Sequence, residues 1–357
     1  MARRSLVGIA LLGATIAAAM MFGRGRHGPP PRGAFYYWQT TWTPAAAANT
    51  WHGAGFDRLY LRFFDVAPAS SENSQRQRVP AIPVAPLELS APLPQGVTIT
   101  PVVFIQNDVL RGGIDTSALA AQILGKIAEV ATQAQVAVDE VQLDCDWSDA
   151  TRGGYFALLR AIKAQAPARL QRKAVVLSAT IRLHQVKYLQ RTGVPPVDRG
   201  MLMYYNMGKI AARSSRLSIY NQEDADKYAS WIDRYPLPLD LALPVFSWAI
   251  QERGDAVVAL LESVAETELA DSNLFARTTA TTYLVTRSGL FHGRYFYQGD
   301  RVRFETVTPE LTRLAARSAA AHQPRHAPFQ TIAFFDLNAR TMARYEPSFF
   351  PKALAVF

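Results

Sequence analysis

The chain has 357 residues, of which 49% are hydrophobic and 19% are charged, and its formal net charge is +9. This length and composition suit one large folded domain or two ordinary ones, and they argue against a disordered chain or a coiled coil. The arginines are scattered and no helix-turn-helix, zinc-finger or RNA-binding pattern accompanies them, so nucleic-acid binding is not expected. A single cysteine, Cys145, excludes an intramolecular disulfide framework.

The N-terminal segment has the order of an export signal. Arg3 and Arg4 precede an apolar run from Leu6 to Phe22, with the small residues Ala17–Ala19 near its end. That order is typical of a secretory signal peptide, and the length of the run also suits an uncleaved membrane anchor. We expect residues 1–22 to be a signal peptide or anchor, with residues 5–22 as the membrane-attached part. A Pro/Gly linker over 23–33 follows. The rest of the chain is then exported, as a periplasmic, secreted or membrane-anchored protein.

From residue 34 onward, strand-like and helical segments alternate. The helical period of 3.6 predicts helices, and runs of β-type residues predict strands. Residues 67–94 are rich in Pro and Ser and predict a long rim loop with an extended stretch near 81–89. The expected helices cover 117–133, 155–165 (ended by Pro167), 224–232, 255–268 and 309–321. The expected strands cover 34–38, 58–66, 97–105, 138–147, 174–181, 200–205, 239–246 and 331–335.

Eight strands, most of them separated by helices, have the count of an α/β fold with a closed sheet. They predict one domain over 34–357, a (β/α)8 barrel of the TIM type. A doubly wound open sheet is the alternative, but the glycine-rich phosphate loop that usually follows its first strand is missing. Between strands seven and eight, residues 281–307 alternate in β fashion around Gln298-Gly299-Asp300, which predicts an inserted β-hairpin.

The fourth expected strand, within Val138–Trp147, carries unusual charge. Period-two alternation puts Gln142, Asp144 and Asp146 on one face, with the two carboxylates about 7 Å apart. Parallel strands covered by helices are normally apolar on both faces. One explanation is a solvated strand end that caps the next helix. The other is an acid/base pair at the mouth of a barrel.

Polar and aromatic residues also follow the other expected strands. Active sites of barrels lie at the carboxyl ends of the strands, so these residues are expected to meet at one rim. Acids, amides and tryptophans at one rim suit a carbohydrate, although each tryptophan taken singly also fits ordinary packing. Neither a His-x-His nor a His-Glu-x-x-His pattern is present, so no metal site and no cofactor are expected. The candidate substrate-binding residues are Trp38, Gln39, Asp65, Gln106, Gln142, Arg182, Asn206, Trp248 and Asp336, with His184 nearby.

Two of these segments resemble motifs of family-18 glycoside hydrolases, the chitinase-like enzymes. The signature Asp-x-x-Asp-x-Asp-x-Glu is matched at Asp139, Gln142, Asp144 and Asp146, and Met-x-Tyr-Asp is matched at Met203–Asn206. The exported part also resembles an uncharacterised bacterial family called domain of unknown function 3142, which implies no activity.

The first resemblance implies a barrel in which the N-acetyl oxygen of the substrate attacks the anomeric carbon. It implies Asp146 as general acid, Asp144 as its partner, Tyr205 as the hydrogen-bond donor to the acetamide and Asn206 as a hydroxyl ligand. The catalytic candidates are therefore Asp144, Asp146 and Tyr205.

Three positions depart from the family pattern. Asp146 replaces glutamate and is shorter by one methylene, about 1.5 Å. Gln142 replaces a carboxylate, and Phe334 and Phe335 stand where the family has a tryptophan. The main hypothesis is an exported glycoside hydrolase, expected to be a monomer, that acts on a cell-envelope or extracellular polysaccharide or oligosaccharide. The alternatives are a non-catalytic glycan-binding barrel and an envelope scaffold protein attached to the membrane through its N-terminal segment.

Overall fold

The computed structural model describes residues 29–47, 55–69, 81–111, 113–262 and 264–357. The chain divides into two compact units, Met1–Pro30 and Pro31–Phe357, and all elements below belong to the second. The predicted signal peptide or anchor, 1–22, and residues 23–28 of the predicted linker lie outside the described residues. Within the described ranges, no helix combines the length and the apolar character needed to cross a bilayer.

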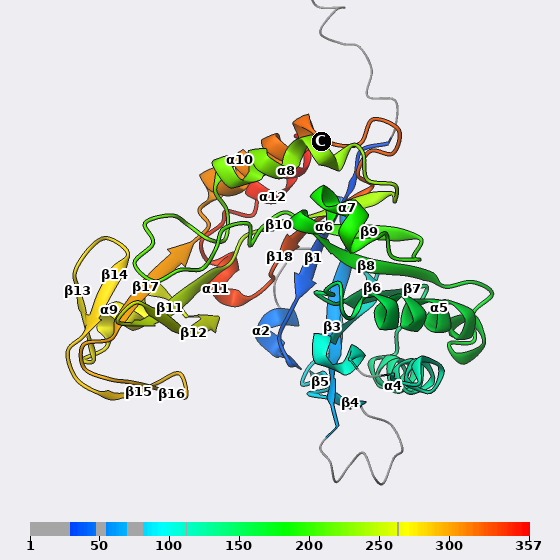
Figure 1. Cartoon of the computed structure of the whole chain (residues 1–357), viewed down its shortest axis with the longest axis horizontal. Helices are drawn as coiled ribbons and strands as arrows, with labels where there is room; N and C mark the ends of the chain where they lie inside the picture. The colour runs from blue at the N-terminus through cyan, green and yellow to red at the C-terminus, as the bar shows by residue number, and fades with distance from the viewer. Residues whose placement is uncertain (1–28, 48–54, 70–80, 112, 263) are drawn as a thin grey trace, which may run out of the picture. The chain divides into compact units, whose positions relative to one another are not determined.

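A closed barrel of eight parallel strands forms the centre of this unit (Figure 1). Neighbouring strands along the chain pair in parallel, and β1 closes the barrel by pairing with both β18 and β3. The predicted (β/α)8 class is confirmed, and every expected barrel strand overlaps an observed one. The barrel strands are β1 (Arg32–Tyr37), β3 (Phe56–Pro68), β6 (Thr98–Ile105), β7 (Glu140–Asp144), β8 (Val176–Arg182), β9 (Arg199–Met203), β10 (Leu239–Pro244) and β18 (Thr331–Phe335).

Helices cover the outside of the barrel. In α4 the Asp115 side chain caps the first turn, accepting from Ser117 N at 3.0 Å and Ala118 N at 2.9 Å, and the predicted apolar stripe is buried. The helices are α2 (Pro44–Ala47), α4 (Thr116–Ala134), α5 (Arg152–Arg169), α6 (Leu183–Lys187), α7 (Leu189–Thr192), α8 (Gln222–Ile232), α10 (Pro309–Ala321), α11 (Ala339–Met342) and α12 (Phe349–Leu354), with a 3-10 turn η1 (Asn107–Leu110).

Helix α5 runs past the point where the sequence predicted its end. Pro167 lies inside the helix, which continues to Arg169. Proline removes only its own N–H donor, and the donors after it still bond: Leu170 N reaches Ala166 O at 2.9 Å, and Arg172 N reaches Pro167 O at 2.9 Å. The expected end at Gln165 was therefore wrong by four residues, about one helical turn.

The described part of the predicted rim loop contains short strands. Strand β4 (Ala81–Val84) pairs antiparallel with β3, and β5 (Glu88–Leu89) pairs in parallel with β2 (Thr41–Trp42). Between the barrel and its helices, Gly200 on β9 leaves room for its neighbours, because a Cβ there would lie 2.7 Å from Ile181 Cγ1. Close packing of the interior thus requires glycine at this position.

A five-stranded antiparallel sheet, the insertion sheet, lies between β10 and β18. Its order is β12-β11-β17-β14-β13, and the hairpin β15–β16 is separate from it. The predicted hairpin, 281–307, covers β14 to β17 and is only part of this larger module. Its elements are β11 (Ser247–Arg253), β12 (Ala256–Glu262), α9 (Glu266–Asp271), β13 (Phe275–Arg277), β14 (Thr282–Val285), β15 (Gly289–Phe291), β16 (Arg294–Phe296) and β17 (Arg301–Thr306).

The helix predicted over 255–268 was wrong. Residues 256–262 form β12, which pairs antiparallel with β11, and only Glu266–Asp271 is helical. The run Val257, Val258, Leu260 and Leu261 fits either period over so short a stretch, and pairing with β11 decides between them.

Candidate active site

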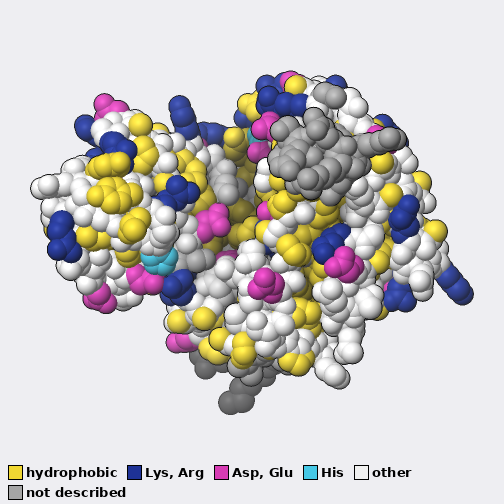
Figure 2. Space-filling model, turned by 90° about the horizontal axis from the view of Figure 1, so that it is seen from below, with side chains coloured by type: hydrophobic (Ala, Val, Ile, Leu, Met, Phe, Trp, Pro, Cys, Tyr) yellow, Lys and Arg dark blue, Asp and Glu magenta, His cyan; other side chains and the backbone are white. Residues whose placement is uncertain are grey.

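The carboxyl ends of the barrel strands and one edge of the insertion sheet surround a cavity of about 640 Å³. Figure 2 shows the surface hollowed between these two parts, with acidic side chains bordering the hollow. Most of the predicted site residues line this cavity, whereas Gln106 and Gln142 do not. The predicted residues in the lining are Trp38, Gln39, Asp65, Asp144, Asp146, Arg182, His184, Tyr205, Asn206, Trp248 and Asp336.

Asp144, the last residue of β7, is held by two donors from β8. Thr180 Oγ1 donates to Asp144 Oδ1 at 2.6 Å, and Arg182 Nη2 donates to the same oxygen at 3.0 Å. Burial lowers the pKa of the Arg182 guanidinium, the Asp144 carboxylate raises it, and the net direction is upward. Asp144 is 5% exposed, so the ion pair sits at the floor of the cavity with a defined orientation.

Asp146 follows the end of β7 and is exposed to the cavity. The residues on either side anchor it: Cys145 is buried, and Trp147 stacks on Tyr155 with ring centroids 5.2 Å apart. Among the described residues Asp146 makes no ion pair. Burial lowers the pKa of His184, and the Asp146 carboxylate partly opposes that effect, so His184 is mainly neutral near pH 7.

Gln142 lies below the cavity, inside the barrel. Tyr36 Oη donates to Gln142 Oε1, and Gln142 Nε2 donates to Ser178 Oγ at 3.3 Å. Ser178 Oγ in turn donates to Glu140 Oε1 at 2.7 Å. An amide both accepts and donates in this chain, which a carboxylate cannot do. Gln142 is fully buried and does not reach a ligand in the cavity.

Gln106 also lies outside the cavity. It is exposed and precedes the 3-10 turn η1, and the part of β6 that lines the cavity is Phe104. The predicted substrate-binding positions Gln106 and Gln142 are thus not brought together with the others. A strand-end rule alone does not separate a residue that faces the rim from one that faces away.

Aromatic side chains form one wall. Phe335 packs against Trp38 at 5.6 Å and against Tyr205 at 5.4 Å between ring centroids. Burial raises the pKa of Tyr205, whose hydroxyl therefore stays a neutral donor, and its Oη donates to Met203 Sδ at 3.3 Å. Trp248 is only 4% exposed, so it backs this wall instead of presenting an open face.

Four further charged groups in the lining were missed by the sequence argument: Arg62, Glu262, Arg340 and Arg344. Arg62 forms a two-point ion pair with Asp65, with Nε–Oδ1 at 2.9 Å and Nη2–Oδ2 at 2.7 Å. Glu262 ends β12 and lies opposite Trp248 in the β11–β12 register. Arg62 falls in the middle of a predicted strand, and Glu262 fell in a segment predicted as helix, so neither was expected at the rim.

Asp336, at the end of β18, is 6% exposed. Asn338 Nδ2 donates to its Oδ1 at 2.8 Å, and the Gln39 side chain also hydrogen-bonds it. Burial raises the pKa of Asp336 to about 6, with the Glu262 carboxylate adding to the rise. Glu262 lies within the cavity walls, and reduced contact with water raises the pKa of its carboxyl too.

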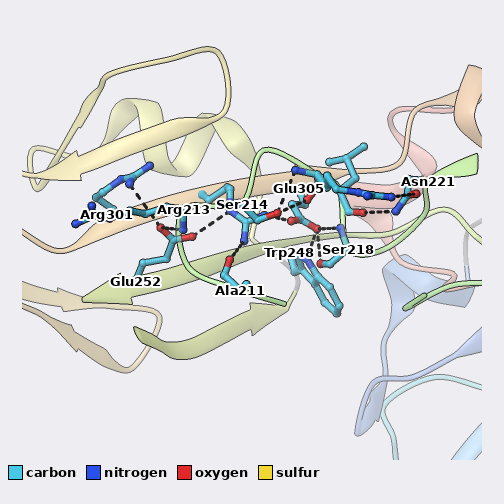
Figure 3. Close-up of polar contacts among 12 residues, drawn as sticks. Ala211, Arg213, Ser214, Ser218, Asn221, Trp248, Glu252, Arg301 and Glu305 are labelled. Atoms are coloured by element: carbon cyan, nitrogen blue, oxygen red, sulfur yellow. Dashed lines mark hydrogen bonds and ion pairs between the residues drawn. The ribbon is translucent and has the colours of Figure 1, made fainter. Parts of the chain in front are cut away.

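A buried network fastens the insertion sheet to the loop after β9 (Figure 3). Glu305 accepts from Trp248 Nε1 at 3.1 Å and from Ser218 Oγ at 2.7 Å, and it is paired with Arg303. Arg303 Nε also donates to Glu252 Oε1 at 3.1 Å. The side chains of both glutamates are at most 1% exposed. The wall that carries Trp248 and Glu262 is therefore fixed relative to the barrel.

No group of three or more His, Cys, Asp or Glu side chains suited to a metal ion is found in the part of the chain that the structure describes. The arrangement can offer carboxyl groups for proton transfer, neutral hydroxyl and amide donors, and an aromatic face.

The structure is a closed (β/α)8 barrel of the TIM type, and this fold is shared with solved glycoside hydrolase structures. The chain is similar to a chitinase from Chromobacterium violaceum, with 11% identity and a TM-score of 0.53 over 91% of this chain and 98% of that chain. It is also similar to the spore cortex-lytic enzyme SleL of Bacillus megaterium, with 11% identity and a TM-score of 0.51 over 92% of this chain and 74% of that chain. At such identities the likeness is one of fold. No family model and no curated protein matches the sequence, so the resemblance to domain of unknown function 3142 stays a prediction.

Proposed function

We propose that the protein is an exported glycoside hydrolase that acts on a cell-envelope or extracellular polysaccharide, with Asp146 as general acid and Asp144 as its partner. The observation that supports this proposal is the meeting of Asp144, Asp146 and Tyr205 at one cavity with an aromatic wall. Export, membrane attachment through residues 5–22 and a monomeric state are further parts of the proposal. Export and membrane attachment rest on the N-terminal sequence.

The chemistry follows from where these groups lie. The acetamide oxygen of the bound sugar attacks the anomeric carbon as the glycosidic C–O bond breaks, and Asp146 gives its proton to the leaving oxygen. Asp144, oriented by Thr180 and Arg182, accepts the acetamide N–H and stabilises the charge that develops on the ring. Water then opens the cyclic intermediate and returns a proton to Asp146. The Tyr205 hydroxyl donates to the acetamide oxygen.

The test compares Asp146→Asn with Asp149→Asn, a nearby carboxylate that is 60% exposed. Purified variants are incubated with a glycan library, and new reducing ends and binding are measured. Asp146→Asn is expected to lower turnover by roughly 10²- to 10⁴-fold while binding persists, the range typical of a lost general acid. Asp149→Asn is expected to behave like the unchanged chain. Equal turnover by Asp146→Asn, on a glycan that the unchanged chain cleaves, removes Asp146 from the role.

A second function is favoured by one observation, the ion pair between Asp144 and Arg182. A guanidinium on this carboxylate weakens its support of positive charge on the sugar ring, so a non-catalytic glycan-binding barrel also fits the site. The same library separates the two: oligosaccharides that bind without yielding reducing ends favour the binding barrel. Failure to bind any sugar favours the third hypothesis, an envelope scaffold protein.

A further inference from the structure

We propose that the glycan taken by this cavity carries free amino groups, and that one ammonium group lies between Glu262 and Asp336. This inference rests on the proposed glycan site and specifies its ligand as a partly N-deacetylated amino-sugar polymer. The acetylated sugar occupies the side of Asp144 and Tyr205. A sugar with a free amine occupies the opposite side.

The charges of the lining are unevenly paired. Arg62 neutralises Asp65, and Arg182 neutralises Asp144. Arg340 is bonded to Glu268, which lies outside the lining, at 2.8 Å. Among the described residues, Asp146, Glu262 and Asp336 form no ion pair. The charged groups and the histidine that line the cavity are Arg62, Asp65, Asp144, Asp146, Arg182, His184, Glu262, Asp336, Arg340 and Arg344.

Arg344 is the cation that faces these carboxylates, but its terminal nitrogens are engaged elsewhere. Its Nη1 donates to Ser247 Oγ at 3.0 Å, and its Nη2 donates to Val245 O at 2.6 Å. Burial lowers its pKa, and the nearby Tyr345 and Asp336 groups partly oppose that effect, so Arg344 offsets part of the charge of Asp336 without forming an ion pair with it. The Glu262–Asp336 side of the cavity therefore keeps an excess of negative charge.

The position of the two carboxyl groups fits a separate subsite. Strand β7, with Asp144, and strand β18, with Asp336, are the fourth and eighth of the barrel and so face each other across its mouth. Asp336 receives its hydrogen bonds from the neutral amides of Asn338 and Gln39, which orient it without cancelling its charge. Glu262 reaches the same space from β12.

A cation is the ligand group that this pair lacks. Asp336 is buried and Glu262 is partly open to solvent, and both carboxyls have raised pKa values because the surrounding protein reduces the hydration of their ionised forms. A positive charge between them favours the ionised forms, whereas a hydroxyl or an acetamide brings no charge that could do so. The aromatic wall of Trp38 and Phe335 beside them supplies the face on which a sugar ring stacks.

The experiment measures binding by calorimetry at pH 6.5, with a tetramer of β-1,4-linked glucosamine and the fully N-acetylated tetramer as probes. The variants are Glu262→Gln, Asp336→Asn and Asp255→Asn. Asp255 belongs to the same insertion sheet module, is 87% exposed and lies outside the lining, so it controls for the loss of one negative charge. We expect Glu262→Gln and Asp336→Asn each to weaken binding of the glucosamine tetramer about tenfold or more, a loss of roughly 1.4 kcal/mol. Binding of the acetylated tetramer should change less than about threefold, and Asp255→Asn should change neither.

Each outcome bears on a stated proposal. If Glu262→Gln leaves binding of the glucosamine tetramer unchanged while the acetylated tetramer binds and is cleaved, the amine subsite is refuted and the hydrolase proposal stands. If the variants lose glucosamine binding but no glycan is ever cleaved, the subsite stands and the hydrolase proposal fails. If neither tetramer binds the unchanged chain, both proposals are overturned.

Discussion

Replacing Asp336 by asparagine tests whether this buried carboxyl lowers the free energy of unfolding when it ionises. Its pKa of about 6 in the folded chain, against an ordinary value of 3.8, means that folding favours the protonated form. The folded state therefore holds more protons than the unfolded state between these pH values, and stability from this group falls as pH rises through that window. The full effect is about 3 kcal/mol, since each pKa unit corresponds to about 1.4 kcal/mol. Between pH 4 and pH 7 we expect about 2 kcal/mol of it.

The assay is urea denaturation of the unchanged chain and of Asp336→Asn from pH 4 to pH 8. Asparagine does not titrate, so the variant should gain about 2 kcal/mol relative to the unchanged chain between pH 4 and pH 7. Asp255→Asn, which removes an exposed carboxylate, should give a curve parallel to that of the unchanged chain. A parallel curve for Asp336→Asn as well would refute the raised pKa and, with it, the claim that ionised Asp336 lacks a cation.

Three further predictions concern packing and burial. Arg303→Met leaves buried Glu305 without its cation and leaves Glu252 with only the 4.0 Å contact to Arg301, so it should lower the free energy of unfolding by about 3–5 kcal/mol. Arg301→Met, at 36% exposure, should cost far less, and equal losses in urea denaturation would contradict this. Gly200→Ala puts a Cβ 2.7 Å from a side chain of β8 and should lower the free energy of unfolding by about 1–3 kcal/mol. Gly125→Ala has open space on an exposed helix face and should raise the free energy of unfolding by up to about 1 kcal/mol. Thermal denaturation distinguishes the loss of stability from the gain. Cys145 is buried, and burial raises the pKa of its thiol. A maleimide at pH 8 should therefore label Cys145 in denaturant and not in the folded chain. Rapid labelling of the folded chain would show that the thiol is accessible and would contradict this prediction.

The barrel was predictable from the sequence because its strands carry a strong local signal. Runs such as Phe56–Pro68 and Val176–Arg182 are long, rich in β-type residues and bounded by turns or helices. The order of strands and helices along the chain then leaves few topologies to choose among. The insertion sheet was not predictable in the same way. Its strand Ala256–Glu262 has no local feature that excludes a helix, and its pairing partner decides its structure.

The site was predictable where a residue ends a strand or directly follows one, as Asp144 and Asp336 do. Prediction failed where the direction of a side chain, or contact with a distant segment, decides whether a residue lines the cavity. Gln106 is exposed outside the cavity, and Gln142 is used inside the barrel. Glu262 reaches the cavity only because β12 folds back along β11. Such placements depend on contacts between segments far apart in the chain, which local periodicity does not encode.

The insertion sheet leaves and rejoins the barrel at one point. Ser247 pairs with Thr306 at the base of β11 and β17, and Val307 N donates to Phe246 O at 3.1 Å. A sixty-residue module whose two ends touch behaves as a cassette: removing it or exchanging it for another leaves a gap that a short turn can close. The barrel and one wall of its cavity are thus encoded by separable parts of the gene. Recombination that exchanges the insertion sheet can change the ligand preference and leave the barrel unchanged.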